Sequence, residues 1–192
     1  MNIDLTGRKA VVTGSTAGIG RAIAEGLARA GAAVVVNGRG QERVAAALRE
    51  LRELFPKGEF IGVPADLATP EGAAELFARA PDADILVNNV GTGLPKSFFE
   101  IEDSEWIDLF ELNVMSGSRA SRHYVPNMTK RGWGRVVLRN CCLASSCVTP
   151  CASAAAFIQP PIISELVGPG RTELTVTPVP ATVSAKPLAM AN

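Results

Sequence analysis

A glycine-rich segment near the start of the sequence carries the residue types of a phosphate-binding turn. Residues 13–20 read Thr-Gly-Ser-Thr-Ala-Gly-Ile-Gly, follow an apolar run at residues 10–12 and precede a helical pattern over residues 21–30. Glycines permit a tight turn and close ligand approach, and a helix start offers free N–H groups. A strand before and a helix after are the context that this motif requires. We therefore expect a nucleotide phosphate site formed by Gly14, Ser15, Thr16, Gly18, Ile19 and Gly20.

Short apolar runs and amphipathic segments alternate along the chain and would position this turn. The apolar runs lie at residues 10–12, 34–36, 60–63, 84–87 and 135–138. Uninterrupted apolar runs are typical of strands buried on both faces of a parallel sheet. Helical spacing recurs between them, as at Ile23 and Leu27, and a later helix is expected from Asp103 or Ser104 through Asn113. The alternation predicts an α/β fold with a Rossmann-type doubly wound parallel sheet.

Composition and charge indicate a globular protein and give no sign of a nucleic-acid-binding one. The 192 residues carry no formal net charge, so nothing favours nucleic acid as a partner. Hydrophobic residues make up 47%, which is normal for a globular domain. Residues 1–5 include an acid and have no apolar core, so we expect no signal peptide and a cytoplasmic protein whose four cysteines stay reduced.

Three later motifs accompany the glycine turn. Asp66-Leu67 follows the third apolar run, Asn88-Asn89-Val90-Gly91 follows the fourth, and Asn113 lies in the expected helix. In this order and spacing the four motifs resemble those of the short-chain dehydrogenase/reductases, and the resemblance covers residues 5–138. It implies a Rossmann-type fold, a nicotinamide cofactor, and hydride transfer to or from a small-molecule carbonyl or alcohol.

The resemblance also implies roles for single residues. It places Asp66 and Leu67 at the adenine, and Asn89 and Gly91 beside the cofactor. It makes Asn113 the helix asparagine of the family's catalytic tetrad. Purely local roles stay open for two of these motifs, because an aspartate at this place also suits a helix cap and an asparagine pair also suits a turn.

The residues after the second apolar run bear on the choice of cofactor. Dinucleotide sites that use NAD usually carry an acid about 20 residues beyond the glycines, bonded to the ribose 2′-OH. This chain reads Val36-Asn37-Gly38-Arg39 there and has no acid. A guanidinium forms charge-assisted bonds with phosphate, so Arg39 favours NADP over NAD. The alternative is that Arg39 is a solvated loop cation.

The groups for proton transfer are not where the resemblance requires them. The family's proton donor is a tyrosine after the fifth strand, followed four residues later by a lysine that lowers its pKa. Here the tyrosine position falls at Ala154 and the position of the catalytic serine at Cys141. The single tyrosine, Tyr124, precedes the fifth apolar run, and Met128 stands four residues after it. We expect Tyr124 to be a structural residue of a helix, and Asn113 to be the remnant of the tetrad.

From residue 139 onward the composition changes abruptly. Residues 139–192 hold all four cysteines and seven of the thirteen prolines, but only five charged residues. Strand–helix alternation ends there, so the sheet is expected to be incomplete on its C-terminal side. We interpret residues 1–138 as an NADP-binding domain and residues 139–192 as an atypical Pro/Ser/Cys-containing tail, which is disordered or arises from a shift of reading frame. The four cysteines lack paired Cys-x-x-Cys spacing, so we expect no metal site. The uncharged stretch over residues 140–164 is rich in Ser and Pro, so we expect no membrane span.

Two functions are compatible with these observations. The first is an NADP-dependent oxidoreductase of the short-chain type, catalytically impaired because the Tyr-x-x-x-Lys pair is absent. The second is a non-catalytic nucleotide-binding half-domain or a non-functional frame-shift product. An oligomer is compatible with either, and turnover separates the two.

Overall fold

Strands and helices alternate through residues 3–139, the part of the chain that the computed structural model describes. In chain order the elements are β1 (Lys9–Val12), α1 (Gly18–Arg29), β2 (Ala33–Gly38), α2 (Gln41–Leu54), β3 (Phe60–Pro64), α3 (Pro70–Arg79), β4 (Ile85–Asn88), the 3₁₀ turn η1 (Phe98–Glu100), α4 (Asp103–Phe110), the π-helical turn η2 (Glu111–Met115), α5 (Ser116–Lys130) and β5 (Arg135–Leu138). Each of the apolar runs forms a strand, and the strand bounds agree with the expected ones within two residues.

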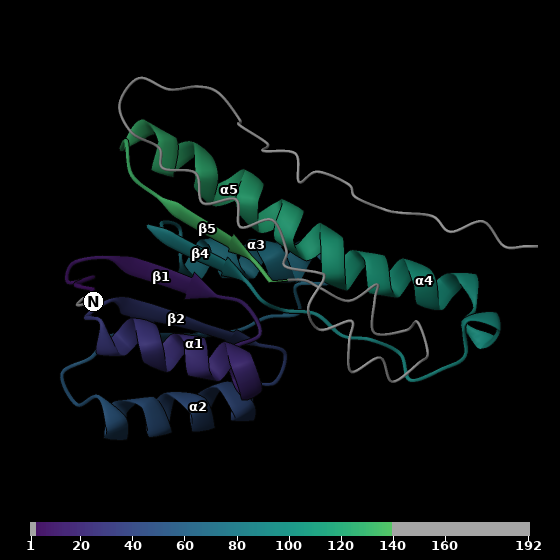
Figure 1. The fold of residues 1–192 in the computed structure, drawn as a ribbon, viewed down its shortest axis with the longest axis horizontal. Coiled ribbons are helices and arrows are strands. Elements are labelled where there is room, and N and C mark those ends of the chain that lie inside the picture. Colours follow the sequence, from purple (N-terminus) through teal and green to yellow (C-terminus); the bar gives the residue numbers. More distant parts are fainter. Residues whose placement is uncertain (1–2, 140–192) are drawn as a thin grey trace, which may run out of the picture.

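The strands form one parallel sheet in the order β3-β2-β1-β4-β5. β1 lies at the centre, where Val11 is paired with Val35 on one side and Leu86 on the other. The chain builds outward from β1 to β3 and then crosses to β4 on the opposite side of β1 (Figure 1). The predicted Rossmann-type doubly wound sheet is therefore confirmed. In such sheets ligands bind at the carboxyl ends of the strands where the order reverses, here between β1 and β4.

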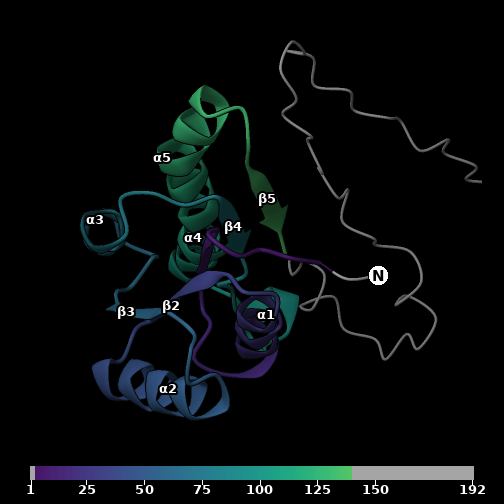
Figure 2. The same cartoon turned by 90° about the vertical axis from the view of Figure 1, so that its left-hand side faces the viewer.

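Helices cover both faces of this sheet (Figure 2). α1 and α2 pack against one face, and α3 and α5 pack against the other. The side chains of β1 divide accordingly, since Ala10 and Val12 belong to the core under α1 and α2, and Val11 packs with Tyr124 of α5. Burial on both faces explains why the strands read as uninterrupted apolar runs.

The segment after α4 differs from the sequence prediction. The sequence predicts one continuous helix from Asp103 or Ser104 through Asn113, whereas the structure interrupts it with η2 before α5 begins. Asn113 lies inside this π-helical turn. Single π-helical turns are frequent at functional sites. Periodicity did not reveal this one, because a π-helical turn adds a residue to the helix without requiring a particular residue type.

β5 forms one edge of the sheet within residues 3–139. Val137 and Leu138 on it are 46% and 44% exposed. Within residues 3–139, no helix combines the length and apolar character of a membrane span, and no group of three His, Cys, Asp or Glu side chains is placed to hold a metal ion. The predictions for the tail, including those for Cys141 and Ala154, fall outside the described residues.

Candidate functional site

The glycine-rich turn leaves β1 and enters α1, as the sequence predicts. Gly14 and Gly18 have φ angles of 61° and 57°, a left-handed conformation that glycine adopts without strain. The N-cap of α1 is Ala17, which makes no side-chain capping hydrogen bond. The N–H groups of a first helical turn have no intrahelical partner. Those of α1 therefore present the positive end of the helix to an anion.

Gly20 lies where the chain approaches itself most closely in this turn. A Cβ at Gly20 would collide with the carbonyl oxygen of Gly14 and the side-chain amide of Asn89. A Cβ at Gly14 would lie 3.0 Å from the Cα of Val90. The glycines therefore allow α1 to pack directly on the end of β4, in addition to admitting a ligand to the backbone.

Thr13 and Asn89 join the glycine turn to the end of β4. The hydroxyl of Thr13 accepts the backbone N–H groups of Asn89 and Val90 at 2.9 and 3.0 Å. The side-chain amide of Asn89 donates to the carbonyl oxygens of Thr13 and Gly14 at 2.9 and 3.0 Å. These bonds connect residues 75 to 77 positions apart in the sequence, so Asn89 holds two strand ends together rather than only shaping its own turn.

Asn37, which sequence reasoning did not assign to the site, connects three strand ends. Its Oδ1 accepts the N–H of Gly14 at 3.2 Å, and its Nδ2 donates to the carbonyl oxygens of Val63 and Ala65, both at 3.1 Å. Its backbone N–H donates to Ser15 Oγ at 3.0 Å, and its carbonyl accepts the Ser15 N–H at 2.8 Å. Asn37 is 1% exposed. The signal that could have identified it is a polar residue at the end of an apolar run, since buried polar groups are hydrogen-bonded.

Arg39 lies one residue beyond β2 and is exposed. Its guanidinium makes no hydrogen bond or ion pair with any other residue in the range 3–139. Together with Asp66 and Thr92 it lines a cavity of about 500 Å³ at the carboxyl ends of the strands. A cavity of about 710 Å³ opens at the opposite ends of the strands and contains none of the motif residues.

Asp66 and Leu67 follow β3 and face different surroundings. Asp66 lines the cavity beside Arg39, and its carboxylate accepts the N–H of Ala68 at 3.1 Å. The cap of α3 is Thr69, whose hydroxyl accepts a first-turn N–H, so the capping role considered for Asp66 belongs to Thr69. The side chain of Leu67 is 2% exposed and belongs to the core under α3 and α5.

Asn113 joins η2 to the loop that follows β4. Its Oδ1 accepts the N–H of Thr92 and its Nδ2 donates to the carbonyl oxygen of Thr92, both at 2.9 Å. Gly91 permits this contact, because a Cβ at that position would lie 2.6 Å from the Asn113 Oδ1. Two hydrogen bonds to Thr92 therefore hold the Asn113 side chain against Gly91.

A third cavity, of about 220 Å³, opens at the mouth of the glycine turn. It is lined by Gly14, Ala17, Ile19, Gly20, Asn89, Val90, Gly91 and Arg139. Arg139, which by composition belongs to the tail, donates its backbone N–H to Asn88 at 2.8 Å and its guanidinium to Asn89 Oδ1 at 3.0 Å. The start of α1 and a guanidinium therefore meet in one cavity, and both favour a negatively charged ligand.

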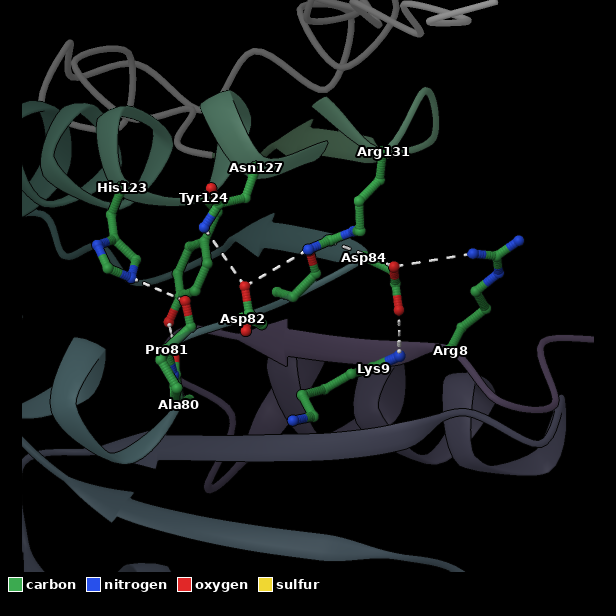
Figure 3. A network of polar contacts seen from close by, with 11 residues as sticks. Arg8, Lys9, Ala80, Pro81, Asp82, Asp84, His123, Tyr124, Asn127 and Arg131 are labelled. Atoms are coloured by element: carbon green, nitrogen blue, oxygen red, sulfur yellow. Dashed lines mark hydrogen bonds and ion pairs between the residues drawn. The ribbon is translucent and has the colours of Figure 1, made fainter. Parts of the chain in front are cut away.

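Tyr124 lines none of these three cavities and belongs to the core, as expected. Its ring is fully buried, and its hydroxyl donates to the carbonyl oxygen of Ala80 at 2.7 Å (Figure 3). Nearby, His123 contacts the carbonyl of Pro81 at 3.0 Å, so the polar groups of α5 dock on the segment before β4. Burial, and secondarily the negative charge of Asp82, raises the pKa of Tyr124, so this phenol stays protonated near neutral pH.

We expect Tyr124→Phe to lower the free energy of unfolding by about 1–2 kcal/mol, because it leaves the buried carbonyl of Ala80 without a donor. The nucleotide affinity should not change. An unfolded tyrosine has a pKa of about 10, so the raised folded pKa stabilises the native state below that pH and the stabilisation is lost as pH rises above it. We therefore expect the free energy of unfolding to fall less between pH 8 and pH 10.5 in Tyr124→Phe than in the unaltered chain, as measured by urea unfolding. An equal loss in both would contradict this role.

Family comparison agrees with the fold and the motifs. A family model described as short chain dehydrogenase matches residues 8–146. The oxidoreductase YvaG of Bacillus subtilis (strain 168) is 47% identical over 137 residues, which cover 71% of this chain and 52% of that protein. A D-beta-hydroxybutyrate dehydrogenase of Rhizobium meliloti (strain 1021) is 37% identical over 134 residues, which cover 68% of this chain and 52% of that protein. The chain thus spans about half the length of these curated relatives.

Solved structures give the same result. L-sorbose reductase from Gluconobacter frateurii, complexed with NADPH and L-sorbose, is 41% identical, with a TM-score of 0.66 over 71% of this chain and 53% of that chain. A gluconate 5-dehydrogenase from Beutenbergia cavernae with bound NADP is 38% identical, with a TM-score of 0.63 over 71% of this chain and 55% of that chain. The family model and these relatives show that the chain belongs to the short-chain dehydrogenase/reductase family of oxidoreductases.

Proposed function

We propose that this chain binds NADP(H) in preference to NAD(H) and derives from enzymes that transfer hydride between this cofactor and a small-molecule carbonyl or alcohol. The observation that carries the proposal is the exposed Arg39 at the end of β2, beside a glycine turn and with no acid at position 38. Its guanidinium makes no ion pair within residues 3–139, so it is available to the 2′-phosphate. Cytoplasmic localisation and the assignment of residues 1–138 as the cofactor-binding unit belong to the same proposal.

The described residues suit a dinucleotide. The uncapped start of α1 suits the pyrophosphate, as do Gly14, Gly20 and Arg139, which line the cavity at the mouth of the turn. Asp66 suits the adenosine end, because it lines the cavity that contains Arg39. The nicotinamide would supply the hydride, and Asn89, Gly91 and Asn113 hold the wall beside it in place through the bonds described above.

We further propose that this chain is catalytically impaired. The 192 residues contain no Tyr-x-x-x-Lys, and Tyr124 donates to a backbone carbonyl in the core. Asn113 is then the remaining member of the tetrad, and its side chain is hydrogen-bonded to Thr92. The second candidate, a non-catalytic nucleotide-binding half-domain or frame-shift product, is favoured by the composition of residues 139–192. Translation of the other two frames of the coding DNA tests the frame shift, which requires a Tyr-x-x-x-Lys in one of them.

Arg39→Ala should lower the affinity for NADPH by roughly tenfold, the value of one charge-assisted hydrogen bond at an exposed site, and leave the affinity for NADH unchanged. Isothermal titration calorimetry with both cofactors measures the two affinities. Arg49→Ala is the matched control, because Arg49 is an exposed arginine on α2, well away from the end of β2, and should change neither affinity. Equal affinity of the unaltered chain for NADPH and NADH would contradict the proposal.

A further inference from the structure

Gly38, the last residue of β2, stands where an added side chain would meet the side chain of Thr16. A Cβ at Gly38 would lie 2.6 Å from Thr16 Cγ2 and 3.3 Å from Thr16 Oγ1. The backbone does not explain the glycine, because φ at Gly38 is not positive. What excludes a side chain at position 38 is therefore the side chain of Thr16.

Hydrogen bonds restrain the backbone on both sides, next to Thr16 and at Gly38. The N–H of Ser15 donates to the carbonyl of Asn37 at 2.8 Å, and the N–H of Asn37 donates to Ser15 Oγ at 3.0 Å, so the residues next to Thr16 and Gly38 are tied together. The carbonyl of Gly38 accepts the N–H of Ala65 at 2.9 Å, which holds β2 from the other side. A side chain at position 38 would have to be accommodated by Thr16 itself.

Rotation of Thr16 relieves the contact only in part. Threonine carries two heavy atoms on Cβ, distributed over three staggered positions. Two of those positions lie 2.6 and 3.3 Å from the point that a Cβ at position 38 would occupy. Every rotamer therefore keeps at least one heavy atom in one of these two positions. Serine has a single Oγ, which can occupy the third position and leave both of them free.

We propose that Thr16 and Gly38 form a coupled specificity pair, in which the branched side chain of Thr16 excludes an acid from position 38 and so keeps the site selective for NADP(H). The inference rests on the proposed function, because position 38 lies where NAD sites carry the acid that binds the ribose 2′-OH. A Cβ at position 38 would lie 2.6 Å from the Thr16 methyl, so we expect removal of that methyl to let an acid at position 38 bind NAD(H). In this proposal Arg39 attracts the 2′-phosphate, and Thr16 excludes the acid at position 38 that would favour NAD.

The steric part is tested without any cofactor. In the full chain, Gly38→Ala should lower Tm by roughly 2–10 °C, the range expected for overpacking in a domain of this size. Addition of Thr16→Ser to Gly38→Ala should restore most of that loss. Gly26→Ala is the matched control, because a Cβ there meets no atom within 4 Å and it lies in α1, where alanine should raise Tm. A double-mutant cycle with additive effects would overturn the coupling.

The specificity part is tested by titration with NADH and NADPH. Gly38→Asp alone should weaken NADPH through charge repulsion and gain little NADH affinity, because Thr16 displaces the new carboxylate. Thr16→Ser with Gly38→Asp should bind NADH at least roughly tenfold more tightly than Gly38→Asp alone. Equal NADH affinity of these two variants would overturn the specificity role. If the unaltered chain binds neither cofactor, the proposed function fails, and the Tm cycle still decides whether the two residues are coupled.

Discussion

Purified and mixed with NADPH and a panel of ketones and aldehydes, the 192-residue chain is expected to bind the cofactor and to show no measurable carbonyl reduction. Loss of a positioned general acid alone costs roughly 10²–10⁴-fold in rate. Here the lysine that would lower the pKa of a catalytic tyrosine is missing as well, since Lys130 and Lys186 are the only lysines after Tyr124 and neither stands four residues from it. Consumption of NADPH, followed by its absorbance, measures the rate.

Binding and turnover must be separated in that experiment. Gly14→Asp serves as the background, because Gly14 has a φ of 61° and a Cβ there would lie 3.0 Å from Val90 Cα, so this variant should lose the cofactor site. Binding without turnover above this background supports impairment. Reduction well above it would show that another group donates the proton, and would identify the chain as an active enzyme.

Asn37→Ala is expected to lower the free energy of unfolding by about 3–5 kcal/mol, because it leaves the Gly14 N–H and two carbonyls of the β3 end without partners and opens a small cavity. The NADPH affinity should fall with it, since the side chain of Asn37 holds the N–H of Gly14 in the glycine turn. Urea unfolding and calorimetry measure the two effects.

Two further variants show whether the hydrogen bonds of Asn37 cause this effect. Asn37→Asp keeps the size and the acceptor but loses both donors to Val63 and Ala65, and it buries a charge, so it should be at least as damaging as alanine. Asn127→Ala on α5 is the matched control, because its amide makes one long contact of 3.4 Å with Asp82, and it should cost less than about 0.5 kcal/mol. If Asn37→Asp lowers the free energy of unfolding only slightly, the loss in Asn37→Ala is due to packing and not to the hydrogen bonds.

The sequence determined the fold through patterns that do not depend on distant partners. Strands buried on both faces are apolar along most of their length, so β1, β2 and β4 are visible as apolar runs, although Asn37 and Asn88 near the ends of β2 and β4 are buried as well. The left-handed φ at Gly14 and Gly18 and the crowding at Gly20 restrict these positions to glycine, so the turn is visible as well. A missing Tyr-x-x-x-Lys is likewise a property of the sequence alone.

Tertiary structure decided what depends on which residues meet across the sheet. Asn37 reaches Val63 only because β2 and β3 pair with these two residues in register, and Arg139 reaches Asn89 only because β5 pairs with β4. The contact between Thr16 and Gly38 likewise depends on the close approach of the glycine turn to the end of β2. Residue type and spacing predict local conformation, whereas strand register sets these contacts, and a single sequence carries no direct signal of register. The sequence therefore predicted the strands and the glycine turn, and only the packed sheet showed which side chains hold that turn in place.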